Sequence, residues 1–159
     1  MTIAVYPGTF DPVTEGHLDI VKRASKVFTE LVIGIHDKPE KRLLFSIEER
    51  VCMVQETVRD IQNVRVEHFD GLTIDFIHRV NGLVMVRGLR AISDFERELA
   101  MALMNKELAP DIEMVCLMTS SRYQFLSSSA IKEIASLRGS VRGMVPDNVA
   151  LALDRKFAE

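Results

Sequence analysis

Short hydrophobic runs alternate along the chain with longer segments whose apolar residues have helical spacing. The runs are rich in valine, isoleucine and leucine, and most are apolar nearly throughout, which is typical of strands buried on both faces of a parallel sheet. We expect strands at residues 3–6, 31–35, 64–69, 83–86 and 112–118. At 64–69 polar residues alternate with apolar ones, so one face of this strand is expected to be more exposed.

The intervening segments carry the signals of amphipathic helices. From Leu18 to Phe28 apolar residues recur every three or four positions. Ser46 and Ser93 each stand three residues before a glutamate, the pattern of a capping box that opens a helix. Helices are expected from these serines to about residues 59 and 108, and at 73–79, 129–137 and 147–157. The alternation predicts an α/β fold: a Rossmann-like, doubly wound, five-stranded parallel sheet with helices on both faces, in a single domain spanning 1–159.

The loops at one end of this sheet are the expected location of a binding site. In doubly wound sheets, ligands bind beyond the carboxyl ends of the strands. Segments with polar, charged or glycine residues follow predicted strands at 7–17, 36–42, 87–90 and 119–129. We therefore expect these segments, which are distant in sequence, to meet at one edge of the sheet and to carry the chemistry.

Composition narrows the classes of function. The 159 residues are 47% hydrophobic, enough for one folded core, and the net charge of -3 argues against a nucleic-acid binder with a broad basic surface. The apolar runs are too short to span a membrane, and Met1 leads into a strand-like run without a basic segment, so we expect no signal peptide. Cys52 and Cys116 lie in apolar stretches without metal-ligand spacing, which predicts reduced core thiols in a cytoplasmic protein.

The first of the four segments has the form of a phosphate site. Gly16 leaves space at a predicted helix start, where backbone N–H groups and the helix dipole attract an anion. His17 beside it and Thr9 on the approach can each donate a hydrogen bond to a phosphate oxygen. A Gly-His pair on its own, however, more often marks an ordinary strand-to-helix turn with a surface histidine.

The other three segments offer cations and hydroxyl groups. Residues 37–42 contain three cations, which in isolation indicate a solvated loop and at the ligand edge suit a phosphate. Arg87 and Arg90 flank Gly88, and their rigid donor forks fit phosphate oxygens, although a charged surface turn has the same pattern. The serines at 127–129 precede a predicted helix, where they either bind an anion or only cap the helix.

Longer stretches of the chain carry a family resemblance. Residues 6–20 read YPGTFDPVTEGHLDI, and their T-E-G-H matches the T-x-G-H motif of the nucleotidyltransferase superfamily. The chain also has RGLR at 87–90, DFE at 94–96 and YQFLSSS at 123–129, in the order and spacing of the relatives. On these residues the chain resembles the bacterial phosphopantetheine adenylyltransferase family over essentially its whole length.

The resemblance implies a role for each matching residue. The implied catalytic residues are His17, Lys41 and Arg90. The implied acceptor-binding residues are Thr9, Lys41, Thr73 and Arg87. The implied ATP contacts are Thr9, Phe10, His17, Gly88, Leu89, Arg90, Glu98, Tyr123, Gln124, Phe125, Leu126, Ser127, Ser128 and Ser129. The chain departs from its relatives at Arg42-Leu43, where they often have lysine-proline, and at Arg97, where they often have an aromatic residue.

The implied reaction joins ATP and 4'-phosphopantetheine to give dephospho-coenzyme A and pyrophosphate. A phosphate monoester has a second pKa of about 6, so the attacking oxygen is already anionic and needs no general base. Catalysis rests on positioning and charge stabilisation, without a covalent enzyme intermediate. By the same resemblance Mg²⁺ accompanies the nucleotide without a protein metal site, the chain is a cytoplasmic homohexamer, and coenzyme A binds in feedback. Neither nucleic acid nor a membrane is an expected partner.

Two other functions fit the same residues. Another adenylyl- or cytidylyltransferase of the superfamily would act on a different phosphorylated acceptor, and the acceptor-side residues Lys41, Thr73 and Arg87 decide between the two. A sensor of nucleotides or coenzyme A would bind without turnover. The intact set of Thr9, His17, Lys41 and Arg90 argues against a sensor, which has no need of a group that stabilises a transition state.

Overall fold

A computed structural model describes residues 2–37 and 42–158, and these contain one parallel sheet. Its strands are β1 (Ile3–Gly8), β2 (Glu30–His36), β3 (Val64–Phe69), β4 (Val84–Leu89) and β5 (Glu113–Met118). They lie in the order β3-β2-β1-β4-β5, and every neighbouring pair is parallel. The winding direction therefore reverses between β1 and β4, where a doubly wound sheet opens a crevice for ligands. The predicted Rossmann-like α/β fold is confirmed.

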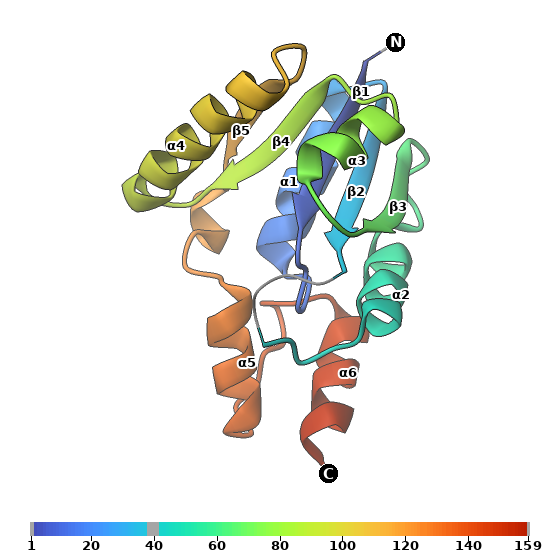
Figure 1. The fold of residues 1–159 in the computed structure, drawn as a ribbon. Helices are drawn as coiled ribbons and strands as arrows, with labels where there is room; N and C mark the ends of the chain where they lie inside the picture. The colour runs from blue at the N-terminus through green and yellow to red at the C-terminus, as the bar shows by residue number, and fades with distance from the viewer. Residues whose placement is uncertain (1, 38–41, 159) are drawn as a thin grey trace.

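Helices cover both faces of the sheet and its carboxyl end. They are α1 (Glu15–Val27), α2 (Ile47–Val58), α3 (Thr73–Arg79), α4 (Ile92–Leu108), α5 (Ser128–Ser136) and α6 (Asp147–Ala158), with a 3-10 turn at Ser121–Tyr123. In Figure 1, α1 lies behind the sheet, α3 lies in front of it, and α5 and α6 lie below the carboxyl ends of the strands. Every helix within the described ranges is too short or too polar to cross a bilayer.

Alternate residues of the central strands enter two separate hydrophobic layers. In β1, Ala4 and Tyr6 face the layer that Ile20 of α1 joins, whereas Val5 faces the layer that contains Phe76 of α3. The same alternation holds along β2. Because both faces are covered, these strands read as uninterrupted apolar runs in the sequence.

The edge strands are less buried than the central ones. Every residue of β3 before Phe69 keeps part of its surface exposed. Both faces of the strand are thus partly exposed, whereas the alternation of residues 64–69 predicts exposure of one face. No position of β5, which forms the opposite edge, is buried. The hydrophobic core of the described residues is therefore centred on β1, β2 and the first half of β4.

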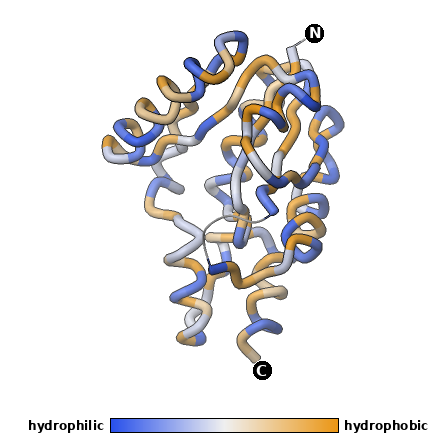
Figure 2. The backbone as a smooth tube through the Cα atoms, viewed as in Figure 1, coloured by the Kyte–Doolittle hydropathy of each residue, from blue (hydrophilic) through white to orange (hydrophobic). Residues whose placement is uncertain are grey.

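Two strands run further than the apolar runs predict. β1 continues through Pro7 to Gly8, and β4 continues to Leu89. The pairing with β5 extends β4, because the ladder runs without interruption to the Leu89–Met118 pair. Arg87 therefore lies inside a strand, near the end where the colour of β4 changes from hydrophobic to hydrophilic in Figure 2.

The predicted capping box at Ser93 is wrong. The N-cap lies two residues earlier, at Ala91, so α4 begins at Ile92, and no side chain caps its first turn. The carboxylate of Asp94 turns back instead and accepts hydrogen bonds from the backbone and the guanidinium of Arg90. The start of this helix is thus set by a contact with the end of β4.

Two further predictions concern the start of α2 and the two cysteines. The capping box at Ser46 is confirmed, with reciprocal hydrogen bonds between Ser46 and Glu49. The prediction that the cysteines are core thiols is wrong. Both are free thiols, but Cys52 is exposed on α2 and Cys116 is exposed on β5. Helices and edge strands have outward faces, and an apolar sequence neighbourhood does not reveal which face a small residue occupies.

Candidate active site

A pocket of about 890 Å³ opens at the β1–β4 junction. The predicted site residues that line it are Thr9, Phe10, His17, Thr73, Arg87, Gly88, Arg90, Glu98, Leu126, Ser127, Ser128 and Ser129. Leu89, Tyr123, Gln124 and Phe125 are not among its lining residues. Lys41 lies outside the described residues. Segments that are far apart in sequence thus meet at one site, as expected.

His17 is held by the first turn of α1. Its Nδ1 accepts a hydrogen bond from the backbone N–H of Thr14 at 3.0 Å, and the Thr14 hydroxyl accepts one from the backbone N–H of His17 at 3.3 Å. This reciprocal pair is a capping box in which histidine occupies the position usually held by glutamate or glutamine. Because an accepting Nδ1 carries no proton, the proton of the neutral imidazole lies on Nε2.

The surroundings of His17 keep its ring neutral. Burial lowers the pKa of His17 to about 4, and the positive charges of Arg90 and Arg87 act in the same direction. The ring also packs against the ring of Phe10, with 5.1 Å between the centroids. At neutral pH, His17 is therefore an uncharged hydrogen-bond donor at the pocket wall, suited to an oxygen on which negative charge develops.

The turn after β1 is tightly packed around Phe10. This residue is buried and has a φ of 49°, in the left-handed region that residues other than glycine seldom occupy. A Cβ on Gly8 would come within 2.9 Å of the Phe10 ring. Gly8 is therefore required where β1 ends, and the packing of this turn keeps Thr9 at the pocket wall.

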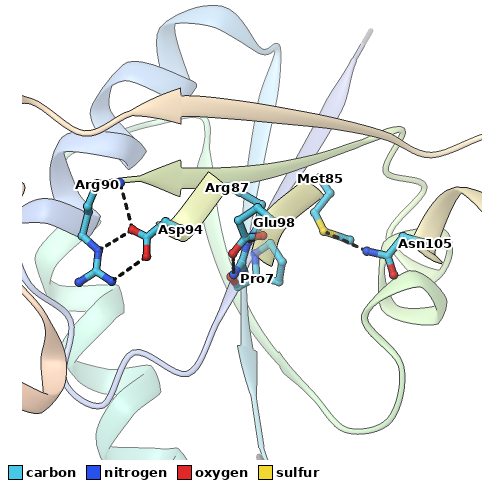
Figure 3. Close-up of polar contacts among 7 residues, drawn as sticks. All are labelled: Pro7, Met85, Arg87, Arg90, Asp94, Glu98 and Asn105. Atoms are coloured by element: carbon cyan, nitrogen blue, oxygen red, sulfur yellow. Dashed lines mark hydrogen bonds and ion pairs between the residues drawn. The ribbon is translucent and has the colours of Figure 1, made fainter. Parts of the chain in front are cut away.

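Arg87 connects β4 to α4 and to the end of β1. Its Nε and Nη2 donate to the Glu98 carboxylate at 2.8 and 2.7 Å, and its Nη1 donates to the Pro7 carbonyl at 3.0 Å (Figure 3). Glu98 is itself buried. Burial opposes the charged form of Arg87, but the Glu98 carboxylate outweighs it and raises the pKa of Arg87. The guanidinium is thus fixed and charged before any substrate arrives.

Arg90 follows β4 directly and joins α4 to the segment before α5. Its Nε donates to Asp94 at 3.1 Å (Figure 3), and its Nη1 donates to the carbonyl of Leu126 at 2.9 Å. Burial raises the pKa of Asp94, but the hydrogen bonds from Arg90 outweigh it and lower this pKa. The Arg90 side chain is 37% exposed, so its remaining N–H groups can reach a ligand.

The serine run both caps α5 and lines the pocket. The Ser127 hydroxyl accepts a hydrogen bond from the N–H of Ala130 at 3.1 Å, which makes Ser127 the N-cap. The Ser128 hydroxyl donates to the carbonyl of Pro12 at 2.8 Å and ties α5 to the β1–α1 connection. The first N–H groups of a helix have no partner within it, so those of Ser128 and Ser129 suit an anion in the pocket.

The glycines of the motifs differ in what their missing side chains allow. A Cβ on Gly88 would lie 3.1 Å from Ile20, so the absence of a side chain there lets α1 pack closely on β4. Gly88 also lines the pocket. A Cβ on Gly16 would make only ordinary contacts, 3.7 Å from Tyr123 being one of them.

Two buried charged residues carry no sequence signal: Asp11, which lines the pocket, and Arg50, which contacts the loops beside it. Asp11 is 3% exposed and pairs with Lys132 of α5, and Arg50 of α2 is fully buried. Asp11 lies within the YPGTFDP stretch and Arg50 follows the Ser46 capping box. Neither position carries a signal of burial, because most of the partners of these side chains are backbone groups.

The carboxylates that line the pocket are all engaged. Asp11, Asp94 and Glu98 each pair with a lysine or an arginine. Within residues 2–37 and 42–158, no group of three or more His, Cys, Asp and Glu side chains is placed to hold a metal ion. These residues do not fit a metal held by the protein alone, whereas an ion carried by a nucleotide brings most of its own ligands.

Known proteins share both the sequence and the fold of this chain. The cytidylyltransferase-like family matches residues 5–134. The phosphopantetheine adenylyltransferase of Clostridium kluyveri is 51% identical over 157 residues, which cover 99% of this chain and 96% of that protein. The phosphopantetheine adenylyltransferase of Clostridium tetani is 54% identical over 149 residues, which cover 94% and 93%.

A solved structure agrees on the fold. The crystal structure described as a nicotinate-nucleotide adenylyltransferase from Vibrio parahaemolyticus has a TM-score of 0.72 to this chain at 14% identity, covering 96% of this chain and 99% of that one. At that identity the likeness concerns the fold alone. The sequence matches extend over nearly the whole length and include the segments that form the pocket. On these grounds the chain belongs to the cytidylyltransferase-like family and, within it, to the phosphopantetheine adenylyltransferases.

Proposed function

We propose that the chain transfers the adenylyl group of ATP to 4'-phosphopantetheine, which gives dephospho-coenzyme A and pyrophosphate. The observation that carries the proposal is the shared pocket, where His17, Arg87, Arg90 and the start of α5 meet. The phosphopantetheine adenylyltransferases of the two Clostridium species share about half of their residues with this chain over almost its full length. The pocket lining runs from Tyr6 to Lys132, which supports a single nucleotidyltransferase unit spanning 1–159.

The reaction is an in-line displacement at the α-phosphorus of ATP. An oxygen of the acceptor phosphate forms a new bond to that phosphorus. The bond from the α-phosphorus to the oxygen that bridges to the β-phosphate breaks, and pyrophosphate leaves with the electron pair. Because the acceptor phosphate is anionic at neutral pH, no protein group has to remove a proton. The chain contributes by aligning two mutually repelling anions and stabilising the charge of the transition state.

His17 is the donor for the α-phosphate in this proposal. Its Nδ1 is occupied by the backbone N–H of Thr14, so Nε2 carries the proton that faces a ligand. A hydrogen bond from Nε2 strengthens as negative charge builds on the α-phosphate oxygens. With a pKa of about 4 the ring stays neutral at physiological pH, so the donor is present throughout the reaction.

The cations divide between the two substrates. We assign Lys41 and Arg87 to the acceptor phosphate, with Thr73 beside the rest of the acceptor, and Arg90 with the start of α5 to the ATP phosphates. A guanidinium has five N–H donors, and contacts with a carboxylate and a carbonyl use three of those of Arg90. Substrate therefore meets arginines that are already ordered, which lowers the entropic cost of binding.

Two small molecules complete the proposal. Mg²⁺ accompanies ATP and supplies positive charge that lowers the repulsion between the triphosphate and the acceptor. Because the pocket carboxylates are paired with cations, the Mg²⁺ ion would be held by phosphate oxygens and water. Coenzyme A contains both an adenine nucleotide and a pantetheine arm, so we propose that it competes for the same pocket and acts in feedback.

We propose that the chain forms a homohexamer, and the exposed apolar residues of α4 support self-association. Of the seventeen residues of α4 only Glu98 is buried. The apolar side chains that α4 leaves exposed are Ile92, Phe95, Leu99, Met101, Leu103, Met104 and Leu108, and Figure 2 shows hydrophobic positions along the whole helix. An apolar surface of this extent is typical of a protein–protein interface. Native mass spectrometry at six times the 18.0 kDa chain mass would support the hexamer, and a monomer would contradict it.

Product analysis tests the proposed reaction. The purified protein, incubated with ATP, Mg²⁺ and 4'-phosphopantetheine, should form dephospho-coenzyme A and pyrophosphate in equal amounts, as resolved by liquid chromatography with mass spectrometry. Nicotinate mononucleotide in place of 4'-phosphopantetheine should give no pyrophosphate. Turnover with that acceptor alone would favour another transferase of the superfamily. Tight ATP binding without pyrophosphate release would instead identify a sensor.

A further inference from the structure

Arg50 is a buried cation whose hydrogen bonds go to backbone carbonyls. Its Nη1 donates to the carbonyl of Thr9 at 2.9 Å and to that of His36 at 2.8 Å, and its Nη2 donates to the carbonyl of Asp37 at 3.0 Å. The side chain is fully buried, and its Nε has no hydrogen-bond partner in the described part of the chain. One guanidinium thus ties the loop after β1 to the loop after β2.

Asp11 is a buried carboxylate that meets the other end of the β2–α2 connection. It accepts hydrogen bonds from the backbone N–H of Leu44 at 3.0 Å and from that of Phe45 at 2.9 Å. Lys132 of α5 donates to the same carboxylate at 2.7 Å. Asp11 therefore joins three segments: the loop after β1 to which it belongs, the residues that lead into α2, and α5.

The two anchors lie on either side of residues that border the pocket. Arg50 holds residues 36–37, where the β2–α2 connection begins, and Asp11 holds residues 44–45, where it ends. Arg42 and Leu43, which directly precede the Asp11 contacts, line the pocket. Both anchors also engage the loop after β1, whose Thr9 lines the pocket.

Stability alone does not account for a charged residue at position 50. Burial of a guanidinium is unfavourable, and an apolar residue of similar size would fill the same space without this cost. Burial accordingly lowers the pKa of Arg50. What the charge adds is a set of strong, directional hydrogen bonds to carbonyls of two separate loops. Such bonds fix where the loops lie relative to each other.

We propose that Asp11 and Arg50 are positioning residues for the transfer, because they hold both ends of the β2–α2 connection against the loop after β1. These contacts fix the position of the acceptor side of the pocket relative to the ATP side. Lys132 of α5 links Asp11 to the ATP side. The inference rests on the proposed function. In the proposed reaction, neither Asp11 nor Arg50 contacts the reacting atoms. A misplacement of about 1 Å between reactants costs roughly 100-fold in rate, so loss of an anchor should lower kcat more than it weakens ATP binding.

Asp11→Asn is the decisive variant. An amide oxygen can still accept hydrogen bonds from Leu44 and Phe45, but the charge that faces Lys132 is lost. We expect kcat to fall about 10- to 100-fold while the KM for ATP stays within about threefold of wild type. Arg50→Met removes the three carbonyl contacts and should lower kcat at least as much. If Arg50→Met does not fold, Asp11→Asn decides the matter alone.

Arg65→Met is the matched control. It removes the ion pairs of Arg65 with Glu30 and Glu67 on β2 and β3, and Arg65 does not line the pocket. Its kcat should equal that of wild type. The inference is overturned if Asp11→Asn keeps the wild-type kcat, or if its kcat falls only in proportion to the folded fraction measured by circular dichroism. Failure of the proposed function is a different result, since wild type would then form no dephospho-coenzyme A.

Discussion

The two walls of the pocket are prepared for substrate in different ways. On the α1 wall, His17 is held through Nδ1 by the backbone, and its Nε2 makes no hydrogen bond within the described residues. On the β4–α4 wall, Arg87 and Arg90 are each bound to a carboxylate of α4 (Figure 3). The first wall offers an uncharged hydrogen-bond donor. The second offers guanidinium groups whose positive charges are already paired with carboxylates and whose remaining N–H groups are free for a ligand.

This difference teaches how an empty site can hold several cations. Two arginines that face one pocket repel each other, and the carboxylates of Glu98 and Asp94 offset this repulsion. The same arginines disfavour protonation of His17. The pocket thereby keeps one neutral donor next to two neutralised cations, and it stays ordered without the substrate anions. The following three experiments test this contrast, from the largest expected effect to the smallest.

Loss of the neutral donor should have the largest effect. His17→Ala is expected to lower kcat by about 100- to 1000-fold, the scale for one donor to a transition state. ATP affinity, measured by isothermal titration calorimetry, should stay within about threefold, because the arginine wall is intact. His68→Ala, an exposed histidine on β3, is the control and should behave as wild type. An undiminished kcat in His17→Ala would remove His17 from the mechanism.

Loss of a paired arginine should affect stability and acceptor use separately. Arg87→Met leaves the buried Glu98 without its partner and should lower the free energy of unfolding by about 2–3 kcal/mol in urea denaturation. Arg87→Met/Glu98→Leu removes both charges and should recover most of that stability. The kcat/KM for 4'-phosphopantetheine should remain at least about tenfold low in both variants. Recovery of acceptor use in the double variant would show that Arg87 is only structural.

The pH dependence of stability should show the smallest effect. The pKa of His17 is about 4 in the folded chain and about 6.5 in an unfolded one, so between these values only the unfolded chain takes up the proton. The contribution of His17 to stability is therefore complete above about pH 6.5 and is lost as the pH falls towards 4. His17→Gln, which keeps a capping-box residue, should lack this loss.

Urea unfolding of both proteins above and below this pH window isolates the contribution of His17. The free energy of unfolding of wild type should fall relative to that of His17→Gln as the pH falls from about 6.5 towards 4. All other titrating groups are common to the two proteins, so they cancel in the comparison. A difference that does not change with pH would mean that the His17 ring titrates at its ordinary pKa.

Much of the fold and part of the site follow from local patterns. Central strands are covered on both faces, so their apolar runs are visible in the sequence, as at Leu31 to Ile35. The motif segments placed His17, Arg87 and Arg90 at the carboxyl end of the sheet, and they do share one pocket. These predictions succeed because each depends on residues that are close together in the chain.

The errors arise where the deciding partner is distant or is a backbone group. The length of β4 depends on its ladder with β5, which no local pattern reports. The expected capping box at Ser93 does not form because α4 begins at Ile92, which places Ser93 inside the first turn. Asp11 and Arg50 make most of their contacts with N–H and carbonyl groups. Every residue type has such groups, so sequence patterns contain no trace of these contacts.

The reciprocal hydrogen bonds between Thr14 and His17 limit which substitutions the start of α1 can accept. By N-cap preference alone, aspartate is at least as favourable as threonine, so a thermostability screen would accept it at position 14. Its carboxylate would replace a hydroxyl that lies 3.1 Å from Nδ1 of His17 and would draw a proton onto that nitrogen. With a proton on Nδ1, the ring would no longer accept the hydrogen bond from the amide of residue 14. A substitution that favours the helix would thus place the His17 proton on Nδ1 instead of on Nε2, where the proposed reaction needs it.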